Sequence, residues 1–415
     1  MNWSDKLTQM KILVVGSGAR EHAICKALVR TGTKPADIIC APGNELIALE
    51  VQTFPEIVAT DRLEVTTLAL QQGIDLAVIG PEAPLVAGVA DALRDQGIAV
   101  FGPNQEAAML EGSKQFAKEV MAAADVPTGM ARECSTITEV EAALDQFGAP
   151  YVVKADGLAA GKGVLVTTDR QAALEHAERF IDEGVLVEEF LDGQEVSLFF
   201  LSDGKTVMPL SPAQDYKRAY DNDEGPNTGG MGAYSPVPWL PEGFVEDMAE
   251  RVAQPTVTEL ARRGAPFVGL LYCGLIVTSR GVKVIEFNAR FGDPETQVVL
   301  RRLQTNLADL LMRSATGKLD VGPVAEFSPR CAVTVVLASE GYPVTNAPVR
   351  PVTGIESAEA MEDVEVCKAS PIGRVLSVVG CGENFQEART LAYEGMSRIS
   401  LEGGFYRNDI GLKVS

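Results

Sequence analysis

The first quarter of the chain repeats one pattern: a short apolar strand, a turn rich in glycine or proline, and a helix. The expected strands are Ile12 to Val15, Ile38 to Ala41, Leu76 to Gly80 and Ala99 to Gly102. Neighbouring parallel strands need a crossover connection, so this alternation indicates a doubly wound α/β sheet. Such sheets bind ligands at the carboxyl ends of their strands, where these turns would lie. We expect an N-terminal ligand-binding domain that ends near residue 111.

The first turn, Gly16-Ser-Gly-Ala-Arg-Glu-His22, leads into a helix expected from Ala23 to Arg30. Backbone amides at such a helix start can bind a phosphate. A dinucleotide fingerprint would have a third glycine at Glu21 and an acidic end to the second strand, which instead ends Cys40-Ala41-Pro42. The turn therefore favours a phosphoribosyl phosphate near Arg20 over a nicotinamide cofactor. A purely structural turn is the alternative.

A second constraint comes from the expected hairpin of Leu270 to Thr278 and Val282 to Phe287, which runs into Asn288-Ala-Arg-Phe-Gly-Asp-Pro-Glu295. Side chains alternate faces along a strand, so Glu286 and Asn288 should point the same way. Mg²⁺ prefers oxygen ligands and keeps positions for water and substrate phosphates. The stretch thus indicates a metal-nucleotide site, and a solvated hairpin tip is the alternative.

Two further expected strands, Tyr151 to Lys154 and Val164 to Thr167, flank the loop Ala155-Asp-Gly-Leu-Ala-Ala-Gly-Lys-Gly163. Amides of such a loop can surround phosphate oxygens, and Lys154 and Lys162 add positive charge. The glycine spacing is one residue short of a Walker A loop, and Gly163 replaces the Ser or Thr that would hold magnesium. We expect a lid over a triphosphate, with an unliganded mobile hairpin as the alternative.

The remaining segments have less specific patterns. A helix is expected from Arg170 to Ile181, a strand from Val185 to Leu191 and a hairpin around Asp203-Gly204. Residues 214–234 read as an irregular polar segment that binds a ligand or is solvated. The C-terminal part predicts strands at residues 331–338 and 374–380 and a helix over residues 385–400, an α+β domain without a catalytic motif of its own.

Composition limits the class of function. A formal net charge of −21 argues against sequence-independent binding to nucleic acid or an anionic membrane. Seven cysteines without a C-x-x-C pair are typical of reduced, mostly buried cytoplasmic thiols, and two histidines exclude a multi-histidine metal site. No apolar run reaches transmembrane length, and the polar leader, residues 1–9, is expected to be dispensable and poorly ordered.

Long motifs, in order along the chain, resemble those of the phosphoribosylamine-glycine ligase family, also called glycinamide ribonucleotide synthetases. They are Gly16-x-Gly-x-Arg-Glu-His22, Gly80-Pro-Glu-Ala-Pro-Leu85, Leu110-Glu-Gly-Ser-Lys114, Lys154-Ala-Asp-Gly-Leu-Ala-Ala-Gly-Lys-Gly163, Gly225-Pro-Asn-Thr-Gly-Gly-Met-Gly-Ala-Tyr-Ser-Pro236 and Glu286-Phe-Asn-Ala-Arg-Phe-Gly-Asp-Pro-Glu295. The resemblance covers Met10 to the C-terminus. Motifs of this length in this order are far more specific than a single glycine-rich loop.

The resemblance implies an α/β and α+β multidomain chain with an ATP-grasp fold. The implied domains are a doubly wound (pre-ATP-grasp) domain at 10–111, a central ATP-grasp domain at 112–130 and 192–326, a small lid domain at 131–191 and a C-terminal α+β domain at 327–415. The implied activity is that of an ATP-dependent carboxylate-amine ligase. It would join glycine to 5-phosphoribosylamine through glycyl phosphate, the second step of de novo purine biosynthesis. Mg²⁺ or Mn²⁺, small-molecule partners, a cytoplasmic location and a monomer, with a dimer as the alternative, are implied as well.

The resemblance also implies roles for individual residues. The implied metal ligands are Glu286 and Asn288. The implied ATP contacts are Lys114, Lys154, Gly161 and Lys162 for phosphates, the backbone of Glu188, Glu189, Phe190 and Leu191 for adenine, and Glu195 for ribose. The implied phosphoribosylamine contacts are Gly16, Gly18, Arg20, Glu21, Asn44 and Glu82. The chamber where glycine is activated would be lined by Asp215, Lys217, Arg290 and Asp293.

Several positions depart from the family pattern. Tyr216 stands where a histidine is common, which argues against a histidine general base there. In the C-terminal part Ser339-Glu-Gly-Tyr-Pro343 replaces a Gly-Gly-Tyr-Pro pattern and Ile372-Gly-Arg replaces Gly-Gly-Arg. The segment between Val166 and Leu186 is shorter than usual, which bears on lid closure. Three other readings stay open: an ATP-grasp ligase for another acid or amine, a catalytically silent nucleotide-binding protein, and a nicotinamide oxidoreductase.

Overall fold

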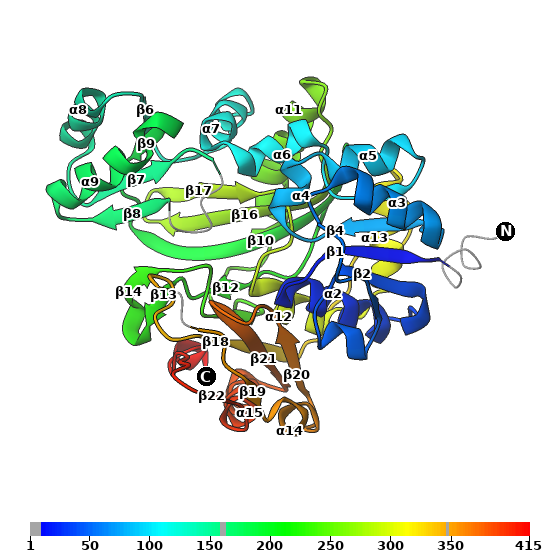
Figure 1. Ribbon diagram of the computed structural model, residues 1–415. Coiled ribbons are helices and arrows are strands. Elements are labelled where there is room, and N and C mark those ends of the chain that lie inside the picture. The colour runs from blue at the N-terminus through cyan, green and yellow to red at the C-terminus, as the bar shows by residue number, and fades with distance from the viewer. Residues whose placement is uncertain (1–9, 158–162, 346–347) are drawn as a thin grey trace.

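The computed structural model describes residues 10–157, 163–345 and 348–415, which form four sheet-based units (Figure 1). The leader predicted at residues 1–9 lies outside the described residues. In Figure 1 the N-terminal unit stands at the right, the lid unit at the upper left and the C-terminal unit below, with the long strands of the central unit between them. The predicted multidomain α/β and α+β architecture is confirmed.

The N-terminal unit is a five-stranded parallel sheet with the order β3-β2-β1-β4-β5. Its strands are β1 (Ile12–Gly16), β2 (Ile38–Pro42), β3 (Gln52–Thr53), β4 (Leu76–Ile79) and β5 (Ala99–Phe101). Its helices are α2 (Ala19–Arg30), α3 (Arg62–Gln72), α4 (Glu82–Val86), α5 (Val89–Asp95) and α6 (Gln105–Gly112). All strand pairs are parallel, so the carboxyl ends of the strands meet at one edge, as predicted. The two-residue β3 was not predicted.

Helix α2 begins earlier than we predicted. The expected start at Ala23 is wrong, because the helix begins at Ala19. The Glu21 carboxylate accepts a hydrogen bond of 2.6 Å from the Gly18 amide, so the side chain satisfies one of the free amides at the helix start. Arg20 and His22 therefore lie within the first helical turns and not in a glycine loop.

The central unit is an antiparallel sheet with the order β11-β10-β16-β17. Its strands are β10 (Gly193–Asp203), β11 (Val207–Pro209), β16 (Val268–Thr278) and β17 (Gly281–Asn288), and its helices are α7 (Lys114–Ala123), α10 (Phe244–Met248), α11 (Gln254–Arg262), α12 (Glu295–Arg302) and α13 (Leu307–Ala315). Both predicted hairpins are confirmed: β10 pairs with β11, with Leu201 opposite Met208, and β16 pairs with β17, with Cys273 opposite Phe287. Most of β10 and β16 is buried on both faces, whereas in β17 only Val284 and Phe287 are buried.

The lid unit has its own small core. Its antiparallel sheet has the order β6-β9-β7-β8, with β6 (Ala131–Cys134), β7 (Tyr151–Ala155), β8 (Val164–Thr167) and β9 (Val185–Glu188). Helices α8 (Ile137–Phe147) and α9 (Arg170–Phe180) pack on it through Val140, Leu144 and Ala177, apart from the two large cores of the molecule. The predicted end of the last strand at Leu191 is wrong, since β9 ends at Glu188 and the following residues connect to β10.

The C-terminal unit contains two strands from the middle of the chain. Its sheet has the order β12-β15-β18-β21-β20, with β12 (Gln214–Asp215), β15 (Gly232–Ser235), β18 (Cys331–Ala338), β20 (Val364–Lys368) and β21 (Arg374–Gly382). Helices α14 (Ile355–Glu359) and α15 (Phe385–Ser397) and the small pairs β13 (Arg218–Tyr220) with β14 (Glu224–Asn227) and β19 (Val352–Thr353) with β22 (Ser400–Leu401) complete it.

The irregular structure predicted for residues 214–234 is thus wrong. These residues form four short strands, and β15 pairs with β18 in the register Ala233 to Thr334. The backbone groups of β15 find partners on β18, about 100 residues further on, which local patterns do not reveal. The predicted extension of the C-terminal helix to residue 400 is also wrong, because Ser400 belongs to β22.

Burial agrees with the prediction for the thiols. All seven cysteines are free and buried. Across the three described stretches of the chain, every helix is too short or too polar to cross a lipid bilayer.

Candidate active site

A cavity of about 1320 Å³ lies where the four units meet. Arg20 and Glu82 reach it from the N-terminal unit, Lys154 from the lid, Glu286 from the central sheet and Arg374 from the C-terminal unit. Pockets between domains that combine apolar walls with a few polar groups are the usual place for small-molecule sites. The cavity has three parts with different chemistry.

The outer part is apolar and shaped by the lid and the central hairpin. Its apolar lining is formed by Met121, Val152, Val166, Phe190, Leu191, Ile276 and Ile285. Glu189 turns away from this part, since its carboxylate accepts from the Met130 amide (3.0 Å) and contacts Lys283 (2.5 Å). The chain after β9 is thereby fixed with Phe190 and Leu191 at the cavity. An apolar niche bordered by free backbone suits a flat heteroaromatic ring.

Next to this niche three lysines surround one glutamate. Glu188 Oε2 lies 2.9 Å from Lys154 Nζ, and Glu188 Oε1 lies 3.3 Å from Lys118 Nζ. Burial alone would raise the pKa of Glu188, but the two lysines hold it below its ordinary value. Burial lowers the pKa of Lys118, and likewise that of Lys114, whose Nζ donates to the Gly157 carbonyl (2.9 Å). This cluster carries more positive than negative charge, as a polyphosphate site requires.

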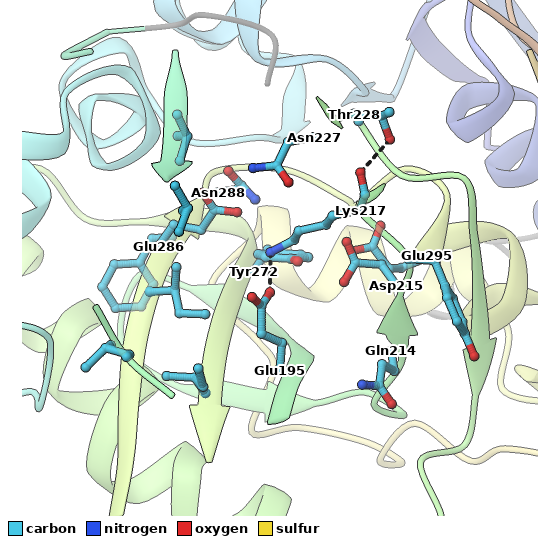
Figure 2. Close-up of a pocket in the computed structure, with 18 of the residues that line it drawn as sticks. Glu195, Gln214, Asp215, Lys217, Asn227, Thr228, Tyr272, Glu286, Asn288 and Glu295 are labelled. Atoms are coloured by element: carbon cyan, nitrogen blue, oxygen red, sulfur yellow. Dashed lines mark hydrogen bonds and ion pairs between the residues drawn. The ribbon is translucent and has the colours of Figure 1, made fainter. Parts of the chain in front are cut away.

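Glu286 and Asn288 extend from β17 into the cavity (Figure 2). Opposite Glu286 stands Gly274, where a Cβ would lie 3.1 Å from Glu286 Cγ, so glycine leaves room for the carboxylate. The Asn288 amide satisfies its neighbours when its nitrogen donates to Glu111 Oε1 (3.2 Å), which leaves its oxygen for another partner. One carboxylate and one amide oxygen fit Mg²⁺ or Mn²⁺, which would take its remaining ligands from water and phosphates.

The middle of the cavity holds a lysine among carboxylates. Lys217 Nζ lies 2.7 Å from Glu195 Oε2, and Figure 2 shows it reaching over the Tyr272 ring to that carboxylate. Ser197 Oγ donates to Glu295 Oε1 (3.2 Å) and accepts from the Tyr272 hydroxyl (2.8 Å).

Charge in this centre is unevenly balanced. Burial, together with the neighbouring Glu295 and Glu195, raises the pKa of Asp215 to about 7 in spite of Lys217. Burial lowers the pKa of Lys217, but Glu195 and Asp215 outweigh it and hold the pKa well above its ordinary value. At neutral pH the lysine is therefore charged, and Asp215 is close to its titration midpoint.

The inner part is built around two arginines, Arg290 of the central unit and Arg374 of the C-terminal unit. Arg290 contacts Glu111 (2.8 Å) and Glu82 (3.3 Å), and these two carboxylates raise the pKa of its guanidinium despite burial. Arg374 donates to Asp293 Oδ2 (2.9 Å), and its other amine donates to the Gly229 carbonyl (2.7 Å). These arginines, with carboxylates at hand, suit an anionic substrate that also carries hydroxyl groups.

The structure brings most residues predicted for the site together. The predicted residues at the cavity are Arg20, Glu82, Lys114, Lys154, Glu188, Glu189, Phe190, Leu191, Glu195, Asp215, Lys217, Glu286, Asn288, Arg290 and Asp293. Gly161 and Lys162 lie outside the described residues.

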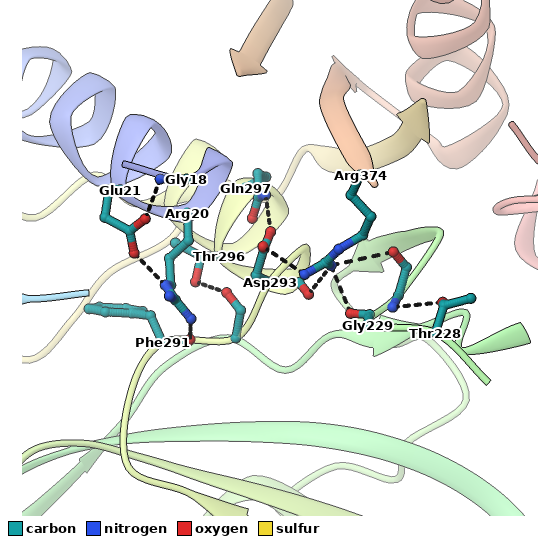
Figure 3. Close-up of polar contacts among 12 residues, drawn as sticks. Gly18, Arg20, Glu21, Thr228, Gly229, Phe291, Asp293, Thr296, Gln297 and Arg374 are labelled. Atoms are coloured by element: carbon teal, nitrogen blue, oxygen red, sulfur yellow. Dashed lines mark hydrogen bonds and ion pairs between the residues drawn. The ribbon is translucent and has the colours of Figure 1, made fainter. Parts of the chain in front are cut away.

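Gly16, Gly18, Glu21 and Asn44 are placed beside the cavity and not in its lining. Glu21 lies at the start of α2, and its Oε1 accepts from Arg20 Nε (2.6 Å). Arg20 Nη1 donates to the Phe291 carbonyl (3.2 Å; Figure 3). The Asn44 amide donates to Ser17 O (2.8 Å) and Lys368 O (3.0 Å). Their predicted role in substrate binding stays a prediction.

Sequence reasoning missed several lining residues: Glu111, Lys118, Gln214, Trp239, Tyr272, Glu295, Tyr342 and Arg374. Glu111 and Glu295 belong to motifs that were recognised, so their acidic side chains were a usable signal. Tyr272 and Gly274 are two residues apart in β16 and so lie on the same face of the strand, toward the cavity. The strand pattern could have placed Tyr272 there as well. Arg374 had no local signal, because its partner Asp293 is 81 residues away.

Comparison with known proteins agrees over the whole chain. Three domain models of phosphoribosylglycinamide synthetase match: the N domain over residues 10–111, the ATP-grasp (A) domain over 112–296 and the C domain over 332–413. Phosphoribosylamine--glycine ligases of Leifsonia xyli and Streptomyces coelicolor are 59% and 55% identical, each over 98% of this chain and 100% of the relative.

Solved structures show the same fold. A phosphoribosylamine--glycine ligase from Thermotoga maritima superimposes with a TM-score of 0.82 at 30% identity, covering 96% of this chain and all of that one. The biotin carboxylase domain of a Hydrogenobacter thermophilus 2-oxoglutarate carboxylase, at 16% identity, has a TM-score of 0.71 over 96% of this chain and 92% of its own.

Proposed function

The chain belongs to the phosphoribosylglycinamide synthetase family, and we propose how its residues divide the ATP-dependent ligation of glycine to 5-phosphoribosylamine. The reaction yields glycinamide ribonucleotide, ADP and phosphate and is the second step of purine biosynthesis. The observation that carries this division is the order of the three cavity parts: an apolar niche with lysines, a centre with Lys217, and an inner part with two arginines.

ATP would lie in the outer part, with adenine against Phe190 and Leu191 and ribose near Glu195. Lys114, Lys118 and Lys154 would contact its phosphates, which supplies charge where the terminal phosphoryl group must be held. Glu286 and Asn288 would hold Mg²⁺ or Mn²⁺, which when bound neutralises phosphate charge. Gly161 and Lys162 belong to the same proposal as loop contacts.

A carboxylate is a poor electrophile, so glycine must be activated before an amine attacks it. Its carboxylate oxygen would attack the terminal phosphorus of ATP, which breaks the bond to ADP and forms glycyl phosphate. Lys217 and Arg290 would hold the glycine carboxylate and the transferring group, since fixed positive charge stabilises a transition state with dispersed negative charge. The Asp215 and Asp293 carboxylates would face the glycine ammonium.

The ribosylamine nitrogen would then attack the acyl carbon, and phosphate would leave. The nitrogen loses one proton in this step. Asp215, with a pKa of about 7, is suited to accept that proton at neutral pH. We place the phosphoribosyl group in the inner part, between Arg20, Glu82 and the loop that carries Arg290 and Asp293, with Gly16, Gly18, Glu21 and Asn44 supporting that wall.

We also propose a cellular location, domain limits and an oligomeric state for the protein. Seven buried free thiols are consistent with work in the reducing cytoplasm. We retain the domain limits assigned from the sequence, and a monomer as the working unit, as proposals. The former are tested by limited proteolysis and the latter by sedimentation.

The direct test measures phosphate release from ATP and Mg²⁺, with glycine and with phosphoribosylamine formed from ribose 5-phosphate and ammonia, omitting each component in turn. We expect release only when both substrates are present, with an equal amount of glycinamide ribonucleotide. Release that is independent of glycine would point to another acid, and no release at all would contradict the proposal.

A further inference from the structure

The hairpin of β13 and β14 frames the part of the cavity that holds Lys217. Lys217 directly precedes β13 and Thr228 directly follows β14, and the Thr228 amide and hydroxyl both donate to the Lys217 carbonyl (2.7 and 2.9 Å). The turn of the hairpin contains Asn222 and Asp223 with φ of 60° and 58°. Asparagine and aspartate adopt the left-handed region more readily than other non-glycine residues, as tight hairpin turns require, and side chains from outside the turn support it further.

That support comes from Arg407, near the C-terminus. Its side chain is fully buried, and its Nη2 donates to Asp223 Oδ1 (2.9 Å), while Nη1 donates to the Arg218 carbonyl (3.0 Å). Asp409 accepts from the same guanidinium through both oxygens (2.8 and 2.7 Å). The fixed fork of an arginine can satisfy these partners together, whereas a lysine ammonium cannot reach all of them in one plane.

Neighbouring residues of the C-terminal segment, defined as residues 405–414, attach the same hairpin at further points. The backbone amide of Asn408 donates to Asp221 Oδ1 (2.7 Å), and the backbone amide of Asn222 donates to Asp409 Oδ2 (2.9 Å). Phe405 packs on Tyr220 with ring centres 5.8 Å apart. The turn is therefore held from both sides by one segment.

The segment also contacts the residue between the two candidate catalytic side chains. Tyr216 separates Asp215 from Lys217, and its hydroxyl accepts from the Gly411 amide (3.0 Å). The Arg407 guanidinium lies 5.0 Å from the centre of the Tyr216 ring, within the range of a cation-π interaction. A shift of Arg407 is thus transmitted to the backbone on both sides of Tyr216.

We infer that Arg407 is a positioning residue of the active site: from the C-terminal segment it fixes the backbone from which Asp215 and Lys217 reach the substrates. Arg407 is not among the described residues that line the cavity, so it acts through these neighbours. This inference rests on the proposed function for its kinetic consequence, but its structural part does not depend on which acid is ligated.

The test compares Arg407→Lys with Arg313→Lys. Arg313 is a matched control, because it is equally buried, pairs with an aspartate (Asp309, 3.0 Å) and donates to backbone carbonyls, but it is remote from the cavity lining. Hydrogen exchange without substrates should increase at residues 214–228 in the Arg407 variant only. Equal exchange in that segment for both variants and the parent protein would overturn the inference, whatever the substrate is.

The kinetic arm measures kcat/KM for glycine and KM for ATP. For Arg407→Lys we expect a fall of about 10²-fold in kcat/KM for glycine, as expected for misplaced catalytic groups, and less than about a twofold change in KM for ATP. The fall should largely disappear when Lys217→Met is already present, because coupled residues are not additive. Additive losses, or losses equal to those of Arg313→Lys, would refute positioning through Lys217.

A second variant covers a failure of Arg407→Lys to fold. Asp223→Asn weakens the same link at a half-exposed side chain and should raise exchange in the turn and lower kcat/KM for glycine by a smaller factor. Absence of both effects would overturn the inference. A parent protein that binds ATP but does not ligate glycine would contradict the proposed function alone, since the exchange result stands by itself.

Discussion

Replacement of Asp215 by asparagine should stabilise the ligand-free protein while it lowers ligation. The Asp215 carboxyl is half-buried at the cavity near Glu295 and Glu195, and its pKa is raised from 3.8 to about 7. Because one pKa unit corresponds to about 1.4 kcal/mol, the ionised carboxylate costs on the order of 4 kcal/mol above pH 7. Asparagine has the same shape and no charge, so the variant avoids this cost.

The pH dependence of this effect has a defined sign. Above pH 7 the carboxylate is charged in both the folded and the unfolded state, and the folded state carries the full cost. As pH falls from about 7 toward 3.8, the folded state binds a proton first, so the cost shrinks and the two proteins converge in stability. We expect the thermal midpoint of Asp215→Asn to exceed that of the parent by several degrees near pH 8 and by much less near pH 5.5.

Asp293→Asn is a matched control with the opposite sign. Burial raises the pKa of Asp293, but Arg374 and Arg20 outweigh it and hold the pKa below its ordinary value, so loss of this charge should destabilise the protein at pH 8. Differential scanning fluorimetry at several pH values checks both variants. A midpoint for Asp215→Asn at or below the parent value at pH 8, or a difference that does not change with pH, would refute the reasoning.

Three more predictions concern single positions. Glu286→Ala should lower turnover by orders of magnitude with an unchanged thermal midpoint, because a metal ligand is lost; normal ligation by the folded variant would contradict the metal assignment. Phe190→Ala should raise KM for ATP about tenfold, as expected when a stacked ring is lost, and leave KM for glycine unchanged in steady-state assays. Burial lowers the pKa of His22, so protonation in the unfolded state should reduce stability as pH falls below about 6.5. His22→Gln should flatten that part of the stability profile, and an identical profile would argue against His22.

Long, regular elements could be predicted from the sequence because their information is local. The hairpin of β16 and β17 is the clearest example. Because side chains alternate faces along a strand, Glu286 and Asn288 could be placed on one face from the sequence. The parallel direction of the strands in the N-terminal sheet could likewise be predicted from the alternation of strands and helices. The family resemblance of the long motifs implied the other expected site residues, including Lys217 and Arg290.

The sequence did not predict elements and residues whose partners lie far along the chain. Strand β15 is recognisable only beside β18, and Arg374 acquires its place only beside Asp293. At the first glycine turn Glu21 accepts from the Gly18 amide, and the phosphate contact predicted there stays a prediction. A local pattern does not say whether a backbone amide is free, so such residues need the folded chain to be interpreted.

The placement of β12 and β15 in the C-terminal sheet has a consequence for how the protein is made. Asp215 belongs to β12 and Lys217 lies between the two strands, but β18, the neighbour of β15, is synthesised roughly 100 residues later. Domains emerging from the ribosome fold in order, so the ATP-binding half can form while its chemical centre is still open. The sheet around this centre can be completed only when β18, which pairs with β15, has left the ribosome.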